Sequence, residues 1–338
     1  MAILDSFSKY ISIDLGTANT LIYINGKGIV LNEPSVIAIE EKTKKVVAVG
    51  HEAKAMVGRT SKNIKVVRPV LDGVIADFDV TEQMLNQFLS KVYKNRGFIR
   101  PKVVVCIPCG VTGVERRAVQ DVTIQAGSRE AIIIEEPMAA AIGAGIMTME
   151  SEGNLVIDIG GGTTEVALIS LGGIVVSESV RVAGDAMDEV IVNAIKLEFN
   201  LAIGESTAEE IKMEIGSAIE DEIFDKKKMD VRGRDLVTGL PKTITIEAKQ
   251  VRKMLEPVIN QILESVRTTL EKTPPELASD LMRRGLLLTG GGALLYGMDK
   301  KISQETEMSV IIPDNPLTVV AIGAGKYLDY IASTKAKK

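Results

Sequence analysis

The chain contains little of what several common kinds of site require. Its 338 residues include two cysteines, one histidine and no tryptophan. Two cysteines are too few for a disulfide scaffold and fit a reducing compartment. Because His51 is the only histidine, any site built on a histidine pair or on a Ser-His-Asp triad of this chain is excluded.

The two cysteines, Cys106 and Cys109, nevertheless form a C-x-x-C pattern. Such a pair can be a redox dithiol or half of a zinc site. Cys106, however, lies within an apolar strand pattern rather than at the start of a helix, where a thiolate would be stabilised. No second pair is present to complete a zinc site. We therefore interpret both cysteines as packing residues.

Long apolar runs and blocks of one charge are also missing. No apolar run approaches the length of about 20 residues that spans a bilayer. The first residues lack the charged start and long apolar stretch of a signal peptide. The formal net charge is −5, and the longest block of like charge is the three lysines at 226–228. Since a nucleic-acid binder normally carries a basic face, we expect a cytoplasmic protein without a nucleic-acid partner.

The chain has ample apolar sequence for a core. With 338 residues, of which 46% are hydrophobic, it suits two domains or one two-lobed unit. Strand patterns over 102–108 and 131–134 flank a helical pattern over 115–126. This alternation is typical of α/β layering with parallel strands.

Three local predictions concern helices. Residues 53–66 have the composition of an exposed helix. Asp79, with Glu82 three residues on, is predicted to cap a helix whose apolar stripe follows. Pro257 is expected to kink or break the long helix predicted over 248–271.

One short design occurs twice. The sequence IDLGT begins at Ile13, and IDIGGGT begins at Ile157. Each is an apolar, β-branched run that continues into an aspartate and breaks into glycine and hydroxyl residues, and each is followed by a second β-rich run. Such a strand delivers a carboxylate to its end, and the glycine turn lets backbone N–H groups point at an anion. Two such units that face each other would hold a polyphosphate and its metal from both sides.

The chemistry of this pair follows from its residue types. Asp14 and Asp158 would hold Mg²⁺, mainly through its waters, because magnesium gives up water reluctantly. Thr17 and Thr163 supply hydroxyl groups, and Thr163 could position a water. Backbone N–H groups would receive the phosphates; they belong to residues 15–20, including Gly16, Ala18 and Asn19, and to Gly160, Gly161, Gly162 and Thr163. Neither unit is a P-loop, and no G-x-G-x-x-G with a ribose carboxylate occurs.

A third glycine segment has the shape of the first two but lacks their charge. A strand over 285–289 leads into Gly290, Gly291, Gly292 and Ala293, which open a predicted helix. No carboxylate lies in this turn. A glycine turn without a metal ligand suits the close approach of a flat base or a ribose.

Glu136 stands directly after an apolar strand and before Pro137 and an alanine-rich helix. Its carboxylate could simply satisfy the helix dipole. Alternatively, it lies at the carboxyl edge of a sheet, where α/β active sites occur, and orients or deprotonates an attacking water. The two glycine units make the second interpretation the better one.

In order, these segments resemble the actin, DnaK-type chaperone and sugar kinase superfamily, and within it the MreB family of bacterial actin homologues. The similarity runs essentially end to end. It is carried by DLGTANTL from Asp14, NEPSV from Asn32, DGVIAD from Asp72, EPMAAA from Glu136 and SVRTTLE from Ser265. One departure is Gly113, where the family usually has an acidic residue before Val-Glu-Arg-Arg; it is expected to alter the start of the next helix.

The resemblance implies an actin-like ATPase fold of the α/β class, with two duplicated ribonuclease H-like lobes around a nucleotide cleft. The core of the first lobe would comprise residues 1–33, 80–148 and 317–338, with a small subdomain over 34–79. The core of the second would comprise residues 149–182 and 247–316, with a small subdomain over 183–246.

The resemblance also implies residue roles. Glu136 would be the hydrolytic glutamate and Thr163 its water partner. A helix predicted over 207–219 carries Glu209, Glu210 and Lys212, which would belong to the nucleotide site, with Glu209 and Lys212 beside the adenine and ribose. On residues alone, that trio also fits a solvated helix face.

As a function, the resemblance implies an Mg-ATP-dependent polymer of double filaments on the inner face of the cytoplasmic membrane. It would guide cell-wall elongation for rod shape, with RodZ, MreC and MreD as partners. The apolar residues Ile3, Leu4 and Phe7, and the loop residues Phe98 and Ile99, would insert into the membrane. The alternative for Ile3, Leu4 and Phe7 is that they belong to a frayed terminus and pack against the rest of the protein.

Two other functions on this fold compete. A soluble phosphotransferase would need an extra carboxylate as base for its substrate hydroxyl, and we can assign none. A chaperone-type nucleotide switch would need a peptide-binding domain, which we do not find beyond the last helix.

Overall fold

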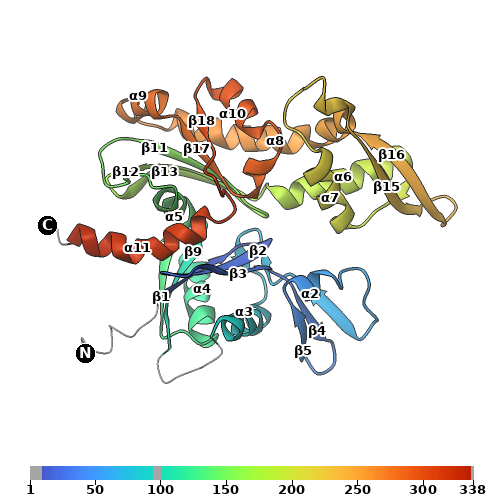
Figure 1. Ribbon diagram of the computed structural model, residues 1–338, viewed down its shortest axis with the longest axis horizontal. Coiled ribbons are helices and arrows are strands. Elements are labelled where there is room, and N and C mark those ends of the chain that lie inside the picture. Colours follow the sequence, from blue (N-terminus) through green and yellow to red (C-terminus); the bar gives the residue numbers. More distant parts are fainter. Residues whose placement is uncertain (1–9, 94–99, 336–338) are drawn as a thin grey trace.

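The computed structural model describes residues 10–93 and 100–335. The predicted membrane-inserting residues Ile3, Leu4, Phe7, Phe98 and Ile99 lie outside these ranges. Figure 1 shows two lobes, one above the other, each with a large sheet and, towards the same end of the molecule, a small one. Within the described residues, none of the helices combines the length and apolar character needed to cross a bilayer.

The two large sheets have the same topology, which confirms the predicted duplication. The first runs β3-β2-β1-β9-β10, and the second runs β13-β12-β11-β17-β18. In each, a central strand pairs antiparallel with the strand that follows it and parallel with a strand from much later in the lobe. The bounds are β1 Tyr10–Leu15, β2 Asn19–Ile24, β3 Gly28–Pro34, β9 Lys102–Ile107 and β10 Glu130–Glu135, then β11 Asn154–Ile159, β12 Thr164–Ser170, β13 Gly173–Val180, β17 Leu286–Thr289 and β18 Val310–Ile311.

Helices cover both faces of the sheets. Their bounds are α2 His51–Lys54, α3 Phe78–Val92, α4 Gly113–Gln125, α5 Glu136–Gly143, α6 Gly184–Phe199, α7 Glu205–Ile215, α8 Ala248–Glu271, α9 Pro275–Arg284, α10 Met298–Thr306 and α11 Val319–Lys335. In the first lobe, the predicted stripe of α3 is buried against the sheet, with Met84, Leu85 and Phe88 fully inaccessible. In the second lobe, α6 and α8 form one core with β11 and β12.

Helices α5 and α11 form a layer between the two sheets (Figure 1). Their apolar cluster includes Val104 and Ile134 from the first sheet and Val156 and Leu287 from the second. The two helices cross closely enough that a Cβ on Gly323 would lie 1.7 Å from the backbone oxygen of Ala139. This layer therefore joins the lobes at the base of the cleft between them.

Each lobe carries a small three-stranded sheet. The first has the order β5-β4-β6, and the second has the order β14-β15-β16. Their bounds are β4 Ile37–Glu40, β5 Val46–Val49 and β6 Ile64–Val67, then β14 Leu201–Ala202, β15 Lys228–Asp235 and β16 Pro241–Glu247; the hairpin β7 Val70–Leu71 and β8 Val74–Ile75 follows β6. The exact subdomain boundaries given above stay a prediction.

The predictions for residues 53–66, for the cap at Asp79 and for the segment after Gly290 are wrong. Residues 53–66 are not a helix: α2 ends at Lys54, and β6 begins at Ile64, because Gly58 takes a left-handed turn and the β-branched residues that follow pair with β4. Asp77, not Asp79, caps α3, since its carboxylate accepts the N–H of Val80 at 3.1 Å.

The third error concerns the segment after Gly290. It forms a short 3-10 turn over Gly291–Leu294, and α10 begins only at Met298. Of the two outcomes predicted for Pro257, a kink or a break, the break does not occur, because α8 continues through it as one helix of 24 residues. Its buried apolar stripe holds it against the second lobe, and this tertiary packing outweighs the local cost of proline.

The departure at Gly113 leaves the start of α4 intact. Thr112 caps the helix, and Glu115 completes a capping box with it. Both cysteines are buried and free, as their interpretation as packing residues predicts. His51 is exposed, and its backbone N–H donates to Glu33.

Candidate nucleotide-binding site

The two glycine motifs form the same turn in the two lobes. In the first glycine turn (residues 16–19), the N–H of Gly16 donates to the oxygen of Asn19 at 3.1 Å. In the second glycine turn (residues 160–163), the N–H of Gly160 donates to the oxygen of Thr163 at 2.9 Å. Each turn joins the central strand of its sheet to the antiparallel strand beside it. The strand, carboxylate, turn and strand therefore recur as predicted.

The two turns lie directly against each other where the lobes meet. A Cβ on Gly161 would lie 2.6 Å from the Cβ of Ala18, and a Cβ on Gly162 would lie 2.7 Å from the Thr17 hydroxyl oxygen. Any larger residue at these positions would push the lobes apart. The Thr17 hydroxyl also accepts the N–H of Gly73 at 3.0 Å.

Each turn is held from behind by its own lobe. The Ser35 hydroxyl donates to the carbonyl of Gly16 at 2.6 Å. On the other side, the N–H of Asp185, at the start of α6, donates to the carbonyl of Gly161 at 2.7 Å. These contacts fix the backbone of both turns before any anion arrives. Neither Ser35 nor Asp185 was predicted from the sequence.

Carboxylates gather beneath the turns, where Asp158 and Glu165 are buried and Asp14 and Glu136 are half-buried. Burial raises the pKa of Asp14 to about 7. Burial, followed by the negative charges of Asp14 and Glu165, raises the pKa of Asp158 to about 8. The pKa of Glu136 is raised well above its usual value, first by burial and then by the charges of Asp14, Glu165 and Asp158. The arrangement concentrates negative charge that a cation would stabilise.

This donor set fits magnesium. All of its groups are oxygen donors, which suit a hard cation. In the ranges 10–93 and 100–335, no three histidine, cysteine, aspartate or glutamate residues lie close enough to hold an ion together. An ion here would therefore keep several waters and depend on further oxygens from a phosphate, which is the usual behaviour of Mg²⁺.

The raised pKa values predict how the stability of the nucleotide-free protein varies with pH. Because Asp14 and Asp158 have folded pKa values of about 7 and about 8, above their unfolded values, the native state binds more protons than the unfolded chain. The free energy of unfolding should therefore fall as the pH rises from about 5 to about 8. Thermal unfolding across this range measures it. Asp158→Asn, which cannot titrate, should flatten the dependence, and a melting temperature that rises with pH would contradict the cluster.

The third glycine segment (residues 290–293) lies beside Asp158. Gly290 has φ of +79°, and a Cβ there would lie 2.3 Å from the carbonyl oxygen of Ile159 and 2.5 Å from a carboxylate oxygen of Asp158. Gly292 packs equally closely on the Ile159 side chain. The structure thus brings the segments around Asp158 and Gly290 together, through the parallel pairing of β11 and β17.

The three charged residues of α7 have separate surroundings. The Lys212 ammonium donates to the carbonyl of Gly184 at 3.0 Å and to Asp188 at 3.0 Å. Since the N–H of Gly184 donates to Gly160, Lys212 is linked to the second glycine turn. Glu209 is half-buried, whereas Glu210 is exposed. Of the predicted trio, Glu210 has the least support from its position.

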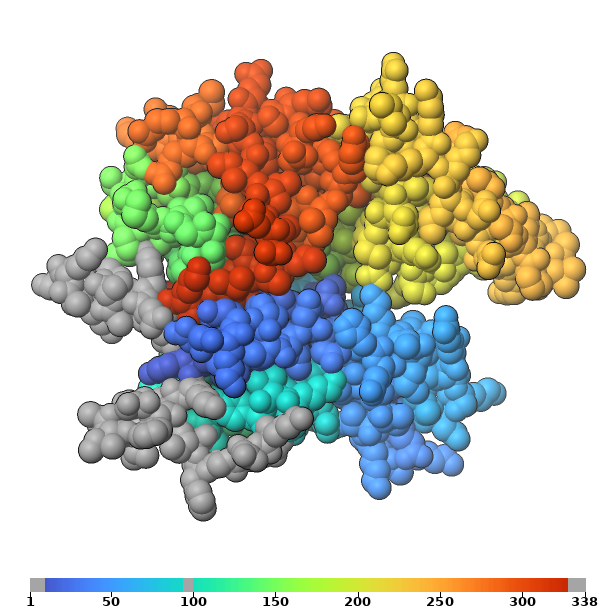
Figure 2. Space-filling view, viewed as in Figure 1, coloured from blue at the N-terminus to red at the C-terminus, as the bar shows by residue number. Residues whose placement is uncertain are grey.

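Two ion pairs cross the cleft between the small sheets. Lys54 of α2 lies 2.6 Å from Glu209 of α7, and Arg68, directly after β6, lies 3.3 Å from Asp185 of α6. In Figure 2, the blue residues of the first lobe and the yellow residues of the second face each other across a narrow groove at this place. The lobes therefore close over the glycine turns in this structure.

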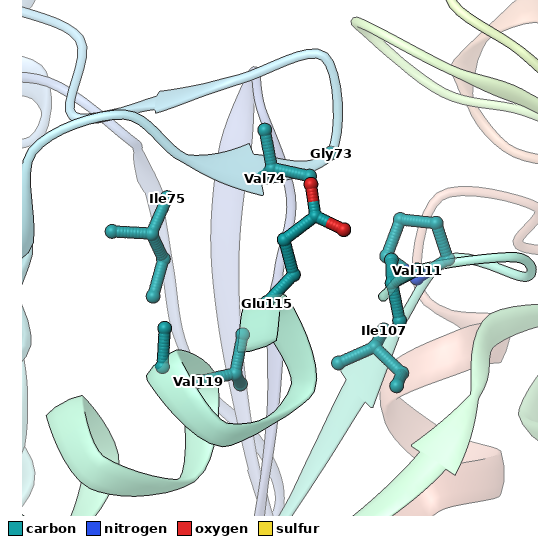
Figure 3. A pocket seen from close by; sticks show the side chains of 9 residues that line it. Gly73, Val74, Ile75, Ile107, Val111, Glu115 and Val119 are labelled. Atoms are coloured by element: carbon teal, nitrogen blue, oxygen red, sulfur yellow. The ribbon is translucent and has the colours of Figure 1, made fainter. Parts of the chain in front are cut away.

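A small apolar cavity lies behind Gly73, as Figure 3 shows. Its volume is about 30 Å³, room for about one water. Ile107, Val111 and Val119 line it together with Val74 and Ile75. This cavity separates α4 from the loop that contacts Thr17.

Glu165 is a site residue that the sequence reading missed. It lies on β12, directly opposite Asp158 in the antiparallel register, and it is fully buried. The available signal was a single charged residue in a mostly apolar strand, two residues after Thr163.

The chain is similar to known proteins over nearly its whole length. The model of the family described as MreB/Mbl protein matches residues 8–336. The chain is 52% identical over 332 residues to the cell shape-determining protein MreB of Escherichia coli (strain K12), which covers 96% of this chain and 94% of that protein.

Solved structures show the same fold. The crystal structure of MreB5 of Spiroplasma citri bound to ADP superimposes with a TM-score of 0.92 at 40% identity, and covers 98% of this chain and 99% of that one. A structure of the MamK double helical filament gives a TM-score of 0.78 at 19% identity, over 95% and 99% of the two chains. The second likeness shows the fold alone.

Proposed function

Because the chain belongs to the MreB/Mbl protein family, an actin-like family of cell-shape proteins, we propose that it is an ATPase whose nucleotide state controls its assembly into filaments. These filaments would lie on the inner face of the cytoplasmic membrane and direct cell-wall elongation. The observation that carries the proposal is the pair of facing glycine turns, each with an aspartate, one from each lobe.

The site suits a nucleoside triphosphate with Mg²⁺. The glycine turns would receive the phosphates on their backbone N–H groups, and Asp14 and Asp158 would hold the hydrated ion. The third glycine segment, with Lys212 and Glu209, would border the adenosine. Nucleotide binding by the family supports this, since the Spiroplasma citri relative was solved with ADP.

Hydrolysis would need a water placed between the lobes. Bound Mg²⁺ would neutralise charge on the β- and γ-phosphates. Glu136, at the start of α5 in the first lobe, would orient the water and accept its proton. The positive charge of bound Mg²⁺ would favour the charged form of this carboxylate, which is the form that can accept a proton. The Thr163 hydroxyl, from the second lobe, would fix the other side of the water.

Assembly would follow from lobe closure. The residues that hold the nucleotide come from both lobes, so bound nucleotide favours one relative placement of the lobes. A filament contact that uses both lobes would then form best in that placement. This links the nucleotide to the polymer without a separate regulatory domain.

Sedimentation tests the proposal. The purified chain should pellet in a concentration-dependent manner with Mg-ATP, and Asp158→Ala should stay in the supernatant at the same concentration. Electron microscopy of the pellet distinguishes filaments from aggregates. A chain that hydrolyses ATP but stays soluble at every concentration would refute the filament, and phosphorylation of a sugar would establish the phosphotransferase instead.

Membrane binding and the partners RodZ, MreC and MreD form the finer part of the proposal. Liposomes of anionic lipid should carry the filaments into the pellet. A variant in which Phe98 and Ile99 are replaced by serine should still form filaments but lose most of this co-sedimentation. Equal recovery of both proteins with liposomes would exclude these two residues as anchors.

A further inference from the structure

We propose that Glu165 is a positioning residue for hydrolysis, which holds the two lobes in register by binding the loop after β9. This inference rests on the proposed ATPase function. It concerns a fully buried carboxylate and the short loop of residues 108–110, which contains the second cysteine of the C-x-x-C pattern.

The contacts of Glu165 join the lobes directly. One carboxylate oxygen accepts the backbone N–H of Cys109, from the first lobe, at 2.8 Å. The other accepts the hydroxyl of Ser179, on β13 of the second lobe, at 2.6 Å. Cys109 itself is only 5% exposed, so the bond lies in the interior. Hydrogen bonds to a charged group are roughly twice as strong as neutral ones.

Burying a negatively charged carboxylate at this position is energetically unfavourable. Glu165 is the only charged residue of β12, whose next four residues are apolar, and the negative groups Asp158 and Glu136 lie near it. An apolar residue would fill the same place in the strand without that repulsion. The hydrogen bonds from Cys109 and Ser179 offset this cost. Of the two, only the bond from Cys109 crosses between the lobes.

The loop that Glu165 holds is connected to both glycine turns through Gly73. A Cβ on Gly73 would lie 2.6 Å from the ring of Pro108 and 2.9 Å from the methyl group of Thr163. The N–H of Gly73 in turn donates to Thr17. A displacement of residues 108–110 would therefore be transmitted to a hydroxyl of each turn.

Loss of the Glu165 contact is expected to slow ATP hydrolysis while leaving ATP binding almost unchanged. The glycine turns are each held within their own lobe, so they keep their shape without Glu165. The water, however, needs Glu136 from the first lobe and Thr163 from the second at the same time. A misplacement of about 1 Å between such groups can cost about 100-fold in rate.

Volume-matched variants test the inference. Glu165→Met keeps the bulk but removes the acceptors; it should bind ATP within about threefold of wild type and hydrolyse it about 10 to 100 times more slowly. Glu165→Gln, whose amide oxygen can accept the Cys109 N–H, should restore the rate to within about threefold. Ser179→Ala, the matched control, loses only the contact within the second lobe and should hydrolyse ATP at nearly the wild-type rate.

These experiments distinguish failure of the ATPase proposal from failure of the positioning role of Glu165. If wild type does not hydrolyse ATP, the ATPase proposal fails. If wild type hydrolyses ATP and Glu165→Met does so equally well, or if Glu165→Gln is as slow as Glu165→Met, the positioning role fails.

A measurement on wild type needs no variant. The amide hydrogen of Cys109 should exchange slowly when ATP is bound, because it is buried and donates to Glu165. Fast exchange of this amide in the ATP-bound protein would also overturn the inference, even if the variants did not fold.

Discussion

Glutamine in place of Glu136 is expected to lower the rate of ATP hydrolysis about 100-fold or more, with nucleotide affinity almost unchanged. The amide cannot accept a proton from the water, and general base catalysis is typically worth a factor of about 100 to 10,000. Glu136 is the first residue of α5, directly after β10, so its backbone is fixed by both elements. The substitution preserves size and removes the negative charge.

Glu135→Gln provides the matched control for this variant. Glu135 is the preceding residue, but its carboxylate is partly exposed and pairs with Arg116 at 2.7 Å. Loss of this ion pair should change the hydrolysis rate less than about twofold, because exposed ion pairs contribute little. Single-turnover hydrolysis with saturating Mg-ATP measures both variants. A Glu136→Gln protein that hydrolyses within threefold of wild type would remove Glu136 from the mechanism.

Gly323→Ala is expected to lower the free energy of unfolding by about 3 kcal/mol. The added Cβ would meet the Ala139 carbonyl oxygen at 1.7 Å, and neither backbone can yield without separating α11 from α5. An alanine in a helix interior otherwise stabilises by about 0.5 to 1 kcal/mol relative to glycine, so the sign of the effect identifies the close crossing.

Gly113→Ala is the control for the helix crossing. Gly113 is the first residue of α4, and a Cβ there meets nothing within 4 Å. This variant should be as stable as wild type or slightly more stable. Chemical unfolding followed by circular dichroism compares the two proteins. Equal stability of Gly323→Ala and Gly113→Ala would show that α5 and α11 do not cross as closely as described.

The duplicated turns were predictable because their signals are local. Asp14 and Asp158 each end an apolar strand, and glycine follows at once, so the strand, the turn and the position of the carboxylate can all be read from a few residues. The parallel pairing of the third glycine segment beside Asp158 extends over residues far apart in the sequence. No local pattern in the sequence predicts it.

Other features depend on tertiary contacts that no local pattern contains. Pro257 predicts a kink or a break, yet the apolar stripe of α8 is buried and the helix continues without a break. Glu165 appears as an isolated charge in a strand, and its meaning depends on the N–H of Cys109 from the other lobe. Residues 53–66 look helical by composition, and only the pairing of β6 with β4 decides otherwise.

One Mg-ATP is expected to bind between the two equivalent turns, and calorimetric titration tests this expectation most directly. Wild type should bind one Mg-ATP per chain. Asp14→Ala and Asp158→Ala should each weaken binding about 30-fold or more, and the double variant should be little worse than either, because each change alone destroys a shared site. Two bound nucleotides per chain, or normal affinity in either single variant, would contradict the two-sided site.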